Sequence, residues 1–267
     1  CSNNVSNQLH NDEFTTFAFV TIKNKTDKQI SDFSKYYIEK VDDCEPDANG
    51  FNVYRTGPNK AIFFERFSND KAHAQHVKNV SPGGCLEEAF GKLNDHFITD
   101  SVFVFGPISD EHVQLLNNFP IQWVYIPEIS GYSVANQSNI YNDKEMTSFV
   151  YMRANNKSDD EIAEFSKYYK DEVYKYESNT SLGWNFYKYG PNKIILLERY
   201  ISDEGSKIHA TNISPGGPLE NEFPKFMDHF VIDSIQNYGF VSEEIKEIQS
   251  NFPIPFSYYS LIEGYSR

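Results

Sequence analysis

Aromatic and β-branched residues gather at the same place in each half of the chain, at residues 14–23 and 146–154, and such stretches predict β-strands. Behind the first strand, apolar side chains recur every three or four positions at Ile30, Phe33 and Tyr37. This spacing predicts a helix that buries one face. The same spacing recurs in the second half at Ile162, Phe165 and Tyr169.

Capping boxes mark where both predicted helices begin. Residues 26–29 ("TDKQ") and 158–161 ("SDDE") each place a hydroxyl side chain at the N-cap and Gln or Glu three residues later. Two further strands follow in the first half, over residues 51–56 and 60–67, joined by a tight turn at 57–59.

A second helical region begins near residue 69 and ends near residue 96. Ser-Pro-Gly-Gly at 81–84 interrupts it, because Pro and Gly break helices, so we expect two helical pieces joined by a sharp corner. A strand, a short helix capped by Ser109 or Ser242, and a last strand over 121–130 or 254–262 complete each half. The order β-α-β-β-α-β predicts a ferredoxin-like fold.

The chain is a tandem duplication. The phrase from Glu65 to Gly84 recurs from Glu198 to Gly217, 133 residues later, with Glu, Arg, His, Asn and Ser-Pro-Gly-Gly at the same places. Internal repeats of this kind define the architecture. The predicted organisation is a flexible tether over 1–13, ferredoxin-like repeats over 14–133 and 146–267, and a polar linker over 134–145.

Each predicted sheet has helices on one face and leaves the other face bare, and a bare face must be buried. We therefore expect an α+β protein in which the two repeats pack sheet to sheet as an intramolecular pseudo-dimeric barrel. The last strand of each repeat is expected to cross over and extend the sheet of the other. Such a chain would act as a monomer.

Composition narrows the partners. The 267 residues carry a formal charge of −14 and a pI of about 4.9, which disfavours binding to nucleic acid. Cys1, followed by a polar Ser- and Asn-rich stretch, resembles the start of a mature bacterial lipoprotein. Acyl chains on Cys1 would anchor the protein to a membrane of the cell envelope, on its periplasmic or outer side. The alternative is a chain that simply begins at this residue.

Cys44 and Cys85 have no counterpart in the other repeat. They either form a disulfide in an oxidising compartment or remain free, and their spacing does not decide between these states.

The strand-to-helix junction resembles the antibiotic-biosynthesis-monooxygenase superfamily of dimeric α+β barrels, over roughly 95 residues of each repeat. The resemblance implies the dimeric α+β barrel fold. The family includes cofactor-free monooxygenases of quinols and polyketides, haem-degrading enzymes and proteins of unknown reaction, so the resemblance implies one of these activities. The matching residues are Glu65, Phe67, Asp70, Ala72 and His76 in the first repeat and Glu198, Tyr200, Asp203 and His209 in the second.

The candidate catalytic residues are His76 and His209. In the family this helix borders the cleft between helices and sheet, so each His is a candidate base for a phenolic substrate, because a deprotonated hydroquinone itself reduces oxygen. The alternative is a His that packs on its helix and bonds a backbone carbonyl. A metal site is not expected, because the neighbouring His73 is replaced by Ser206 in the second repeat.

Six residues around the histidines are candidate substrate contacts, and each has a structural alternative. The Glu–Arg pairs alternate across a strand, so that a Glu either orients the His or forms an ion pair with Arg. Each Asn follows its His by one helical turn and either contacts substrate or caps the helix. The six are Glu65, Arg66, Asn79, Glu198, Arg199 and Asn212.

The leading functional hypothesis is a cofactor-independent oxygenase acting on a small aromatic or quinol-like compound at the cell envelope. The first alternative is a lipoprotein that binds a small apolar ligand without turnover, haem included, with His76 or His209 as axial ligand. The second is a purely structural surface protein, in which Phe and Tyr would fill the clefts.

Overall fold

A computed structural model of the chain describes residues 9–10, 12–134 and 144–267. Cys1 and most of the predicted linker lie outside these ranges. The described residues form two compact units. The repeat-1 unit combines Asp12–Pro127 with Tyr259–Arg267, and the repeat-2 unit combines Glu128–Val134 with Lys144–Tyr258.

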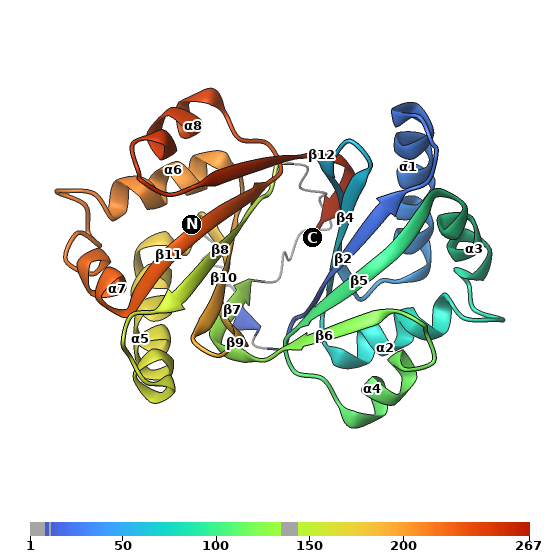
Figure 1. Cartoon of the computed structure of the whole chain (residues 1–267), viewed down its shortest axis with the longest axis horizontal. Coiled ribbons are helices and arrows are strands. Elements are labelled where there is room, and N and C mark those ends of the chain that lie inside the picture. The colour runs from blue at the N-terminus through green and yellow to red at the C-terminus, as the bar shows by residue number, and fades with distance from the viewer. Residues whose placement is uncertain (1–8, 11, 135–143) are drawn as a thin grey trace, which may run out of the picture. The chain divides into compact units, whose positions relative to one another are not determined.

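The sheet of the repeat-1 unit has the strand order β12-β3-β4-β2-β5-β6. Neighbouring strands run antiparallel, except for the parallel pair β5 and β6. Figure 1 shows α1 and α3 on the same side of this sheet. The elements are β2 (Phe14–Ile22), α1 (Asp27–Cys44), β3 (Ala48–Gly57), β4 (Lys60–Phe67), α2 (Asp70–Asn79), α3 (Glu87–His96), β5 (Phe97–Phe105), α4 (Asp110–Leu116), β6 (Gln122–Ile126) and β12 (Phe256–Ser266).

The repeat-2 unit follows the same plan with the order β1-β7-β9-β10-β8-β11. The elements are β1 (Leu9–His10), β7 (Glu128–Val134), β8 (Met146–Ala154), α5 (Asp159–Glu177), β9 (Ser181–Gly190), β10 (Lys193–Tyr200), α6 (Asp203–Asn212), α7 (Phe223–His229), β11 (Phe230–Tyr238) and α8 (Glu243–Ser250). The α+β class and the ferredoxin-like order of both repeats are confirmed.

Local sequence signals explain where the long helices begin. Thr26 and Ser158 each accept a hydrogen bond from the backbone three residues on, and Gln29 and Glu161 return one, so both capping boxes form as predicted. The apolar stripe behind each box is buried in the core of its own unit: Ile30, Phe33, Tyr37 and Val41 in α1, and Ile162, Phe165, Tyr169 and Val173 in α5.

The last strand of each repeat joins the sheet of the other repeat, as expected. In β12, Tyr265 lies opposite Phe51 of β3, and in β7, Tyr132 lies opposite Trp184 of β9. Each added strand pairs a sheet edge that would otherwise expose free backbone groups. The compact units therefore differ from the two sequence repeats at their ends. The packing of the two sheets against each other stays a prediction.

Two boundaries differ from the sequence prediction. The strand expected over 121–130 is two strands, β6 and β7, separated at Pro127, which has no backbone N–H to donate to a ladder. Within the tether expected over 1–13, Leu9 and His10 pair with β7, and Glu13 is buried.

Ser-Pro-Gly-Gly forms the predicted corner between α2 and α3. The backbone N–H of Leu86 donates to the carbonyl of Asn79 at 2.9 Å, which brings the chain back onto the end of α2. Gly83 has a φ of +86°, and a Cβ on Gly84 would lie 2.1 Å from the Asn79 oxygen. Both positions therefore require glycine. The second repeat has the same geometry at Gly216 and Gly217.

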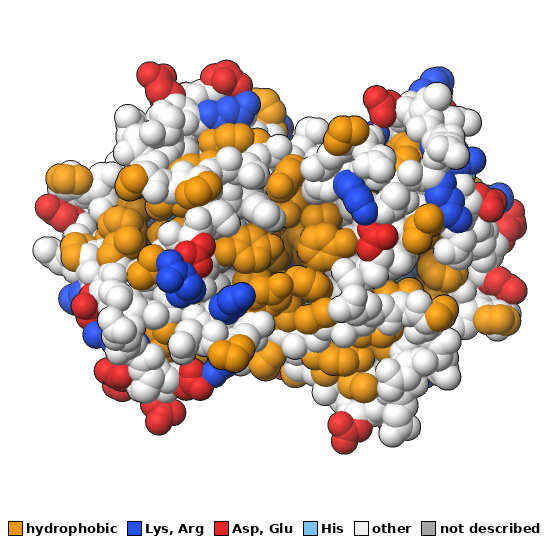
Figure 2. Space-filling view, in the orientation of Figure 1, with side chains coloured by type: hydrophobic (Ala, Val, Ile, Leu, Met, Phe, Trp, Pro, Cys, Tyr) orange, Lys and Arg blue, Asp and Glu red, His pale blue; other side chains and the backbone are white. Residues whose placement is uncertain are grey.

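On the face drawn in Figure 2, acidic and basic side chains are interspersed without a broad field of one sign. None of the helices in the described ranges is long and apolar enough to cross a lipid bilayer.

Replacing Gly84 tests the corner. We expect Gly84→Ala to lower the free energy of unfolding by about 3 kcal/mol, because its methyl group has no space beside the Asn79 carbonyl. Gly91 is the matched control, since it lies inside α3 with nothing within 4 Å of the place where a methyl group would lie. Gly91→Ala should raise stability by about 0.5–1 kcal/mol, as expected for an open helical site. Urea denaturation of both variants measures the difference, and equal effects would contradict the packing argument.

Candidate functional site

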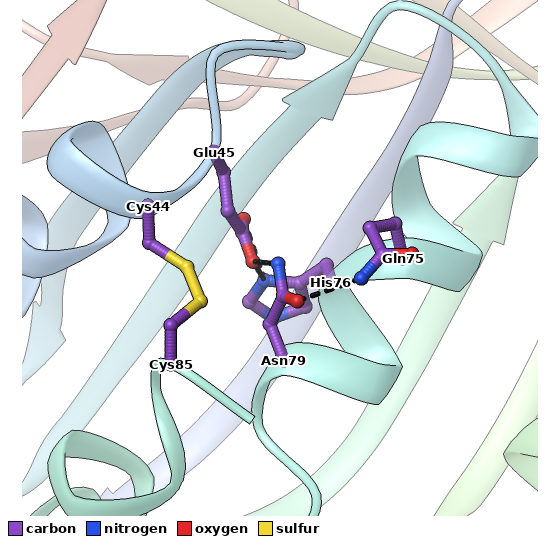
Figure 3. The surroundings of a disulfide bond; sticks show 6 residues. All are labelled: Cys44, Glu45, Gln75, His76, Asn79 and Cys85. Atoms are coloured by element: carbon purple, nitrogen blue, oxygen red, sulfur yellow. Dashed lines mark hydrogen bonds and ion pairs between the residues drawn. A yellow bond between two sulfur atoms is a disulfide. The ribbon is translucent and has the colours of Figure 1, made fainter. Parts of the chain in front are cut away.

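Each repeat contains a buried carboxylate–imidazole pair. In the first, the two oxygens of Glu45 lie 3.0 and 2.9 Å from Nδ1 of His76. The amide of Asn79 donates to the same carboxylate at 2.9 Å, and Gln75 donates to Asn79 at 2.8 Å. Figure 3 shows these side chains converging from the end of α1 and from α2. The Glu45 carboxylate is therefore held by both His76 and Asn79.

The second repeat reproduces this arrangement. Nδ1 of His209 lies 2.9 and 3.1 Å from the oxygens of Glu177, and Asn212 donates to Glu177 at 3.0 Å. Because the His and the Asn are one turn apart, one helix face presents both to a single carboxylate.

A disulfide fixes the end of α1 in the repeat-1 unit. It joins Cys44 to Cys85, with Cα atoms 6.4 Å apart, and Cys44 directly precedes Glu45 (Figure 3). This separation lies in the usual range for disulfides. The structure thus favours the bonded state over the free thiols, and it ties the carboxylate-bearing helix end to the segment before α3.

The surroundings of the histidines decide their protonation. Burial opposes the charged form of His76, but the Glu45 carboxylate outweighs it and raises the pKa of His76 to about 9. The pKa of His209 is raised by the same balance of burial and Glu177. At neutral pH His76 is therefore an imidazolium. The proton-acceptor role expected for it from sequence does not fit this state, whereas a proton-donor role does.

The strand carboxylates have the opposite tendency. Burial raises the pKa of Glu65, and it raises the pKa of Glu198 to about 7, although the nearby histidines partly counteract it. Glu65 accepts a hydrogen bond from Thr16, and Glu198 accepts one from Tyr200, both at 2.9 Å. Each unit therefore places a carboxylate whose pKa is raised by burial near a histidine whose pKa is raised by a second carboxylate, which is the pattern of an acid–base pair.

Both groups line a cavity between the helices and the sheet of their own unit. The repeat-1 cavity, of about 80 Å³, is lined by Glu65, His76 and Tyr37. The repeat-2 cavity, of about 100 Å³, is lined by Glu198, His209, Tyr169 and Trp184. Aliphatic and aromatic side chains form most of the remaining walls. The clefts are not filled by Phe and Tyr, contrary to what a purely structural role requires.

Several polar atoms at the cavity walls have no partner among the described residues. The hydroxyls of Tyr37 and Tyr169 make no hydrogen bond there, and neither do the buried indole N–H groups of Trp123 and Trp184. The pKa of Tyr37 is raised by burial and by Glu65, so its hydroxyl keeps its proton. Unpaired buried donors need an explanation. A ligand with acceptor oxygens would supply one.

The arginines lie away from the cavities, so their prediction as substrate contacts is wrong. Because β4 alternates its side chains, Glu65 faces the helices and Arg66 faces the opposite side. There Arg66 donates to Glu13 at 3.0 Å and to Ser266 at 2.8 Å. Arg199 likewise donates to Glu145 at 2.7 Å. Both are fully buried structural ion pairs.

The asparagines also have another role than expected. Asn79 and Asn212 bond the carboxylates of Glu45 and Glu177, so they orient the ion pairs and do not line the cavities. Glu65 was expected to orient His76. In the structure, Glu45 bonds His76 instead.

Haem does not fit either cavity. A haem carries two propionates that need cationic or donor partners, yet no described residue lining the cavities is Lys or Arg, and each lining includes a Glu. Among the described residues, no group of three His, Cys, Asp or Glu side chains is placed to hold a metal ion.

Sequence reasoning missed Glu45 and Glu177. The signal was present, because the two are 132 residues apart, the same spacing as "FSKYY" in the preceding helix. Trp123 and Trp184 do not occupy equivalent positions in the two repeats, yet each lines the cavity of its own repeat.

Solved structures share this fold. The chain aligns with a candidate monooxygenase from Fusobacterium nucleatum subsp. nucleatum over 96% of its length and 95% of that chain, at 10% identity and a TM-score of 0.59. It also aligns with a candidate monooxygenase from Lactobacillus acidophilus over 85% of its length and 91% of that chain, at 13% identity and a TM-score of 0.51. A Listeria monocytogenes ferredoxin-fold protein related to antibiotic biosynthesis monooxygenases aligns over 87% of this chain and 96% of its own, at 11% identity and a TM-score of 0.35.

No family model matches the sequence, and no curated protein matches it. At such low identities the structural likeness concerns the fold alone. The first two alignments extend over most of the chain, so the ferredoxin-like α+β fold expected from the resemblance is confirmed.

The pH dependence of stability tests the ion pair. The folded pKa of His76, about 9, lies above its ordinary value of 6.5. The resulting stabilisation is therefore complete below pH 6.5 and is lost as the pH rises through 9. Compared with His76→Gln, the wild type should lose about 3 kcal/mol of its free energy of unfolding over this pH window, at about 1.4 kcal/mol per pKa unit.

Chemical denaturation at a series of pH values measures this slope. Glu45→Gln is the matched variant, because it keeps His76 but removes the carboxylate that raises its pKa, and it should lose the slope as well. A His76→Gln protein with the wild-type slope would show that His76 is not the group that titrates.

Proposed function

We propose that the protein is a cofactor-independent oxygenase that adds one atom of O₂ to a small phenolic or quinol-like aromatic compound. The observation that carries this proposal is the pairing, in each apolar cavity, of a carboxylate-bound histidine of raised pKa with a strand carboxylate of raised pKa, Glu198 reaching about 7. Deprotonating a phenol and stabilising its anion requires this pair and a dry cavity.

The cavity walls fit such a substrate. Tyr169 and Trp184 offer unpaired donors to its oxygens, and the His209 ring offers Nε2–H, since Nδ1 is occupied by Glu177. Aromatic and aliphatic walls suit a planar ring. The carboxylate of Glu198 and the absence of Lys or Arg among the described lining residues disfavour an anionic substrate.

The chemistry balances without a cofactor. The carboxylate takes the phenolic proton, and the imidazolium stabilises the resulting phenolate. The electron-rich ring carbon then bonds one atom of O₂, and the peroxide anion takes a proton. Loss of water from the C–H carbon that bears the peroxide leaves a quinone. The ring gives up four electrons, one oxygen atom becomes the new carbonyl, and the other leaves as water.

We further propose that the protein is a lipoprotein of the bacterial cell envelope. The Cys44–Cys85 disulfide supports an oxidising compartment. Expressed behind a lipoprotein signal peptide, the chain should sediment with membranes, and a Cys1→Ala variant should not. Equal recovery of both proteins from the soluble fraction would contradict anchoring through Cys1.

Oxygen consumption tests the oxygenase. We expect the wild type to consume one O₂ per molecule of a 1-naphthol or hydroquinone panel member and to place one ¹⁸O atom from ¹⁸O₂ in the quinone. The double variants His76→Gln/His209→Gln and Glu65→Gln/Glu198→Gln should each lower kcat by about 100-fold or more, the usual loss for an acid–base or anion-stabilising group.

The chain offers a matched control in His96→Gln/His229→Gln. These histidines also occupy equivalent positions, but they bond the carbonyls of Lys92 and Lys225 at helix ends outside both cavities. The double variant should therefore keep wild-type turnover. Binding is read separately by quenching of Trp123 and Trp184, the two tryptophans of the sequence. Quenching without oxygen consumption would indicate a binding protein, and neither signal would refute both roles.

A further inference from the structure

A chain of hydrogen bonds runs from the surface of the repeat-1 unit to its cavity. Oδ1 of Asp70 lies 2.5 Å from Nδ1 of His112, and Nε2 of His112 lies 2.9 Å from Nδ1 of His73. The hydroxyl of Ser109 holds the other oxygen of Asp70 at 2.7 Å. The Asp70 side chain is 21% exposed and that of His112 only 1%, so only the carboxylate end contacts solvent appreciably.

The carboxylate end fixes the first donor of this chain. The Asp70 carboxylate only accepts, so Nδ1–H of His112 donates to it. A relay toward Asp70 then requires Nε2 of His112 to accept from Nδ1–H of His73. This order leaves the Nε2 lone pair of His73 without a partner among the described residues. Because His73 lines the cavity, that lone pair is available to a ligand there.

The surroundings of His73 keep it neutral and dry. Its ring stacks on Phe14 with centroids 4.5 Å apart and meets the edge of Phe67 at 5.0 Å. Burial, followed by the charges of His76 and His112, lowers the pKa of His73 well below its ordinary value. The centroid of the His76 ring, an imidazolium, is only 5.8 Å away. One cavity therefore holds a neutral and a charged histidine side by side.

The repeat-2 unit lacks this chain. Ser206 and Ile245 stand where the first repeat has His73 and His112, and both line the second cavity. Asp203, the equivalent of Asp70, instead accepts the backbone N–H of Ser242 at 3.1 Å. The two cavities therefore share the carboxylate-bound histidine and the strand carboxylate. Among the described residues, only the first has a hydrogen-bonded chain of titratable groups that ends at a partly exposed carboxylate.

We propose that Asp70, His112 and His73 form a proton relay that makes repeat 1 the catalytic half, while repeat 2 binds the same class of ligand with little turnover. The inference rests on the proposed function. The proton that Glu65 takes from the phenol leaves the cavity through the relay: it passes to Nε2 of His73 as Nδ1–H of His73 passes to His112 and Nδ1–H of His112 passes to Asp70. Asp70 exchanges the proton with water, and the reverse path returns one to the peroxide anion.

The relay can be observed without turnover. In protein labelled with ¹⁵N-histidine, we expect neutral His73 to carry its proton on Nδ1 and not on Nε2. Saturation with 4-nitrophenol, a phenol that O₂ does not oxidise, should protonate Nε2 of His73. His73→Ser assigns the resonances. A proton on Nε2 in the free protein, or no change with bound 4-nitrophenol, would overturn the relay even if the oxygenase proposal held.

Variants that copy the second repeat test its catalytic consequence. His73→Ser should lower kcat for the quinol about 100-fold, and His112→Ile about 10-fold, within the usual range for a lost base. In both variants, KM and the quenching of Trp123 should change less than twofold. His112→Gln keeps a polar side chain if His112→Ile folds poorly, and should show the same loss of kcat. Unchanged kcat in all three folded variants would overturn the relay.

The reverse change is the matched gain-of-function experiment. Ser206→His/Ile245→His should build the route into repeat 2 and restore turnover to a chain that carries His73→Ser. If the wild type oxidises no panel member, the oxygenase proposal fails, and the nitrogen resonances of His73 still decide whether the relay exists.

Discussion

A buried ion pair constrains each half of this protein more than any other interaction. Taking a carboxylate and an imidazolium out of water costs several kcal/mol per ion, and their attraction offsets this cost only when good geometry and further hydrogen bonds hold both groups. Glu45 at the end of α1 and His76 in α2 meet this condition through Asn79. The glycine corner after α2 is necessary because it lets the chain return over Asn79 without a clash. The segment that the sequence repeats, Glu65 to Gly84 and Glu198 to Gly217, thus holds a charged histidine in place.

The two repeats show how one scaffold yields two unlike sites. The donor to the strand carboxylate is Thr16 in one repeat and Tyr200 in the other. At the position of Thr16 the second repeat has Ser148, which instead donates to Asn237. The ion pair is the same in both, but His73 occurs in one alone. Duplication therefore kept the anion-stabilising part of the site and let the route for protons differ.

The predictable part of the structure was the part set by local sequence. Capping residues, periodicity and Pro-Gly corners act within a few residues, so the elements and the duplication followed from them. Glu45 is 31 residues from His76, and only the packed fold shows that they meet. The face of Arg66 was equally undetermined, because alternation along a strand separates Glu65 from Arg66 without saying which of them points to the helices.

Residue type alone also assigned the wrong acid–base roles. Histidine is the usual base near neutral pH, but a carboxylate at Nδ1 stabilises its charged form, and burial makes the strand carboxylate the better acceptor. This exchange of roles has an energetic reason. When a phenol gives its proton to Glu65, a carboxylate becomes neutral as a phenolate appears, so the net charge of the apolar cavity does not change. The imidazolium of His76 stabilises whichever of the two anions is present, and no new charge has to be desolvated during the reaction.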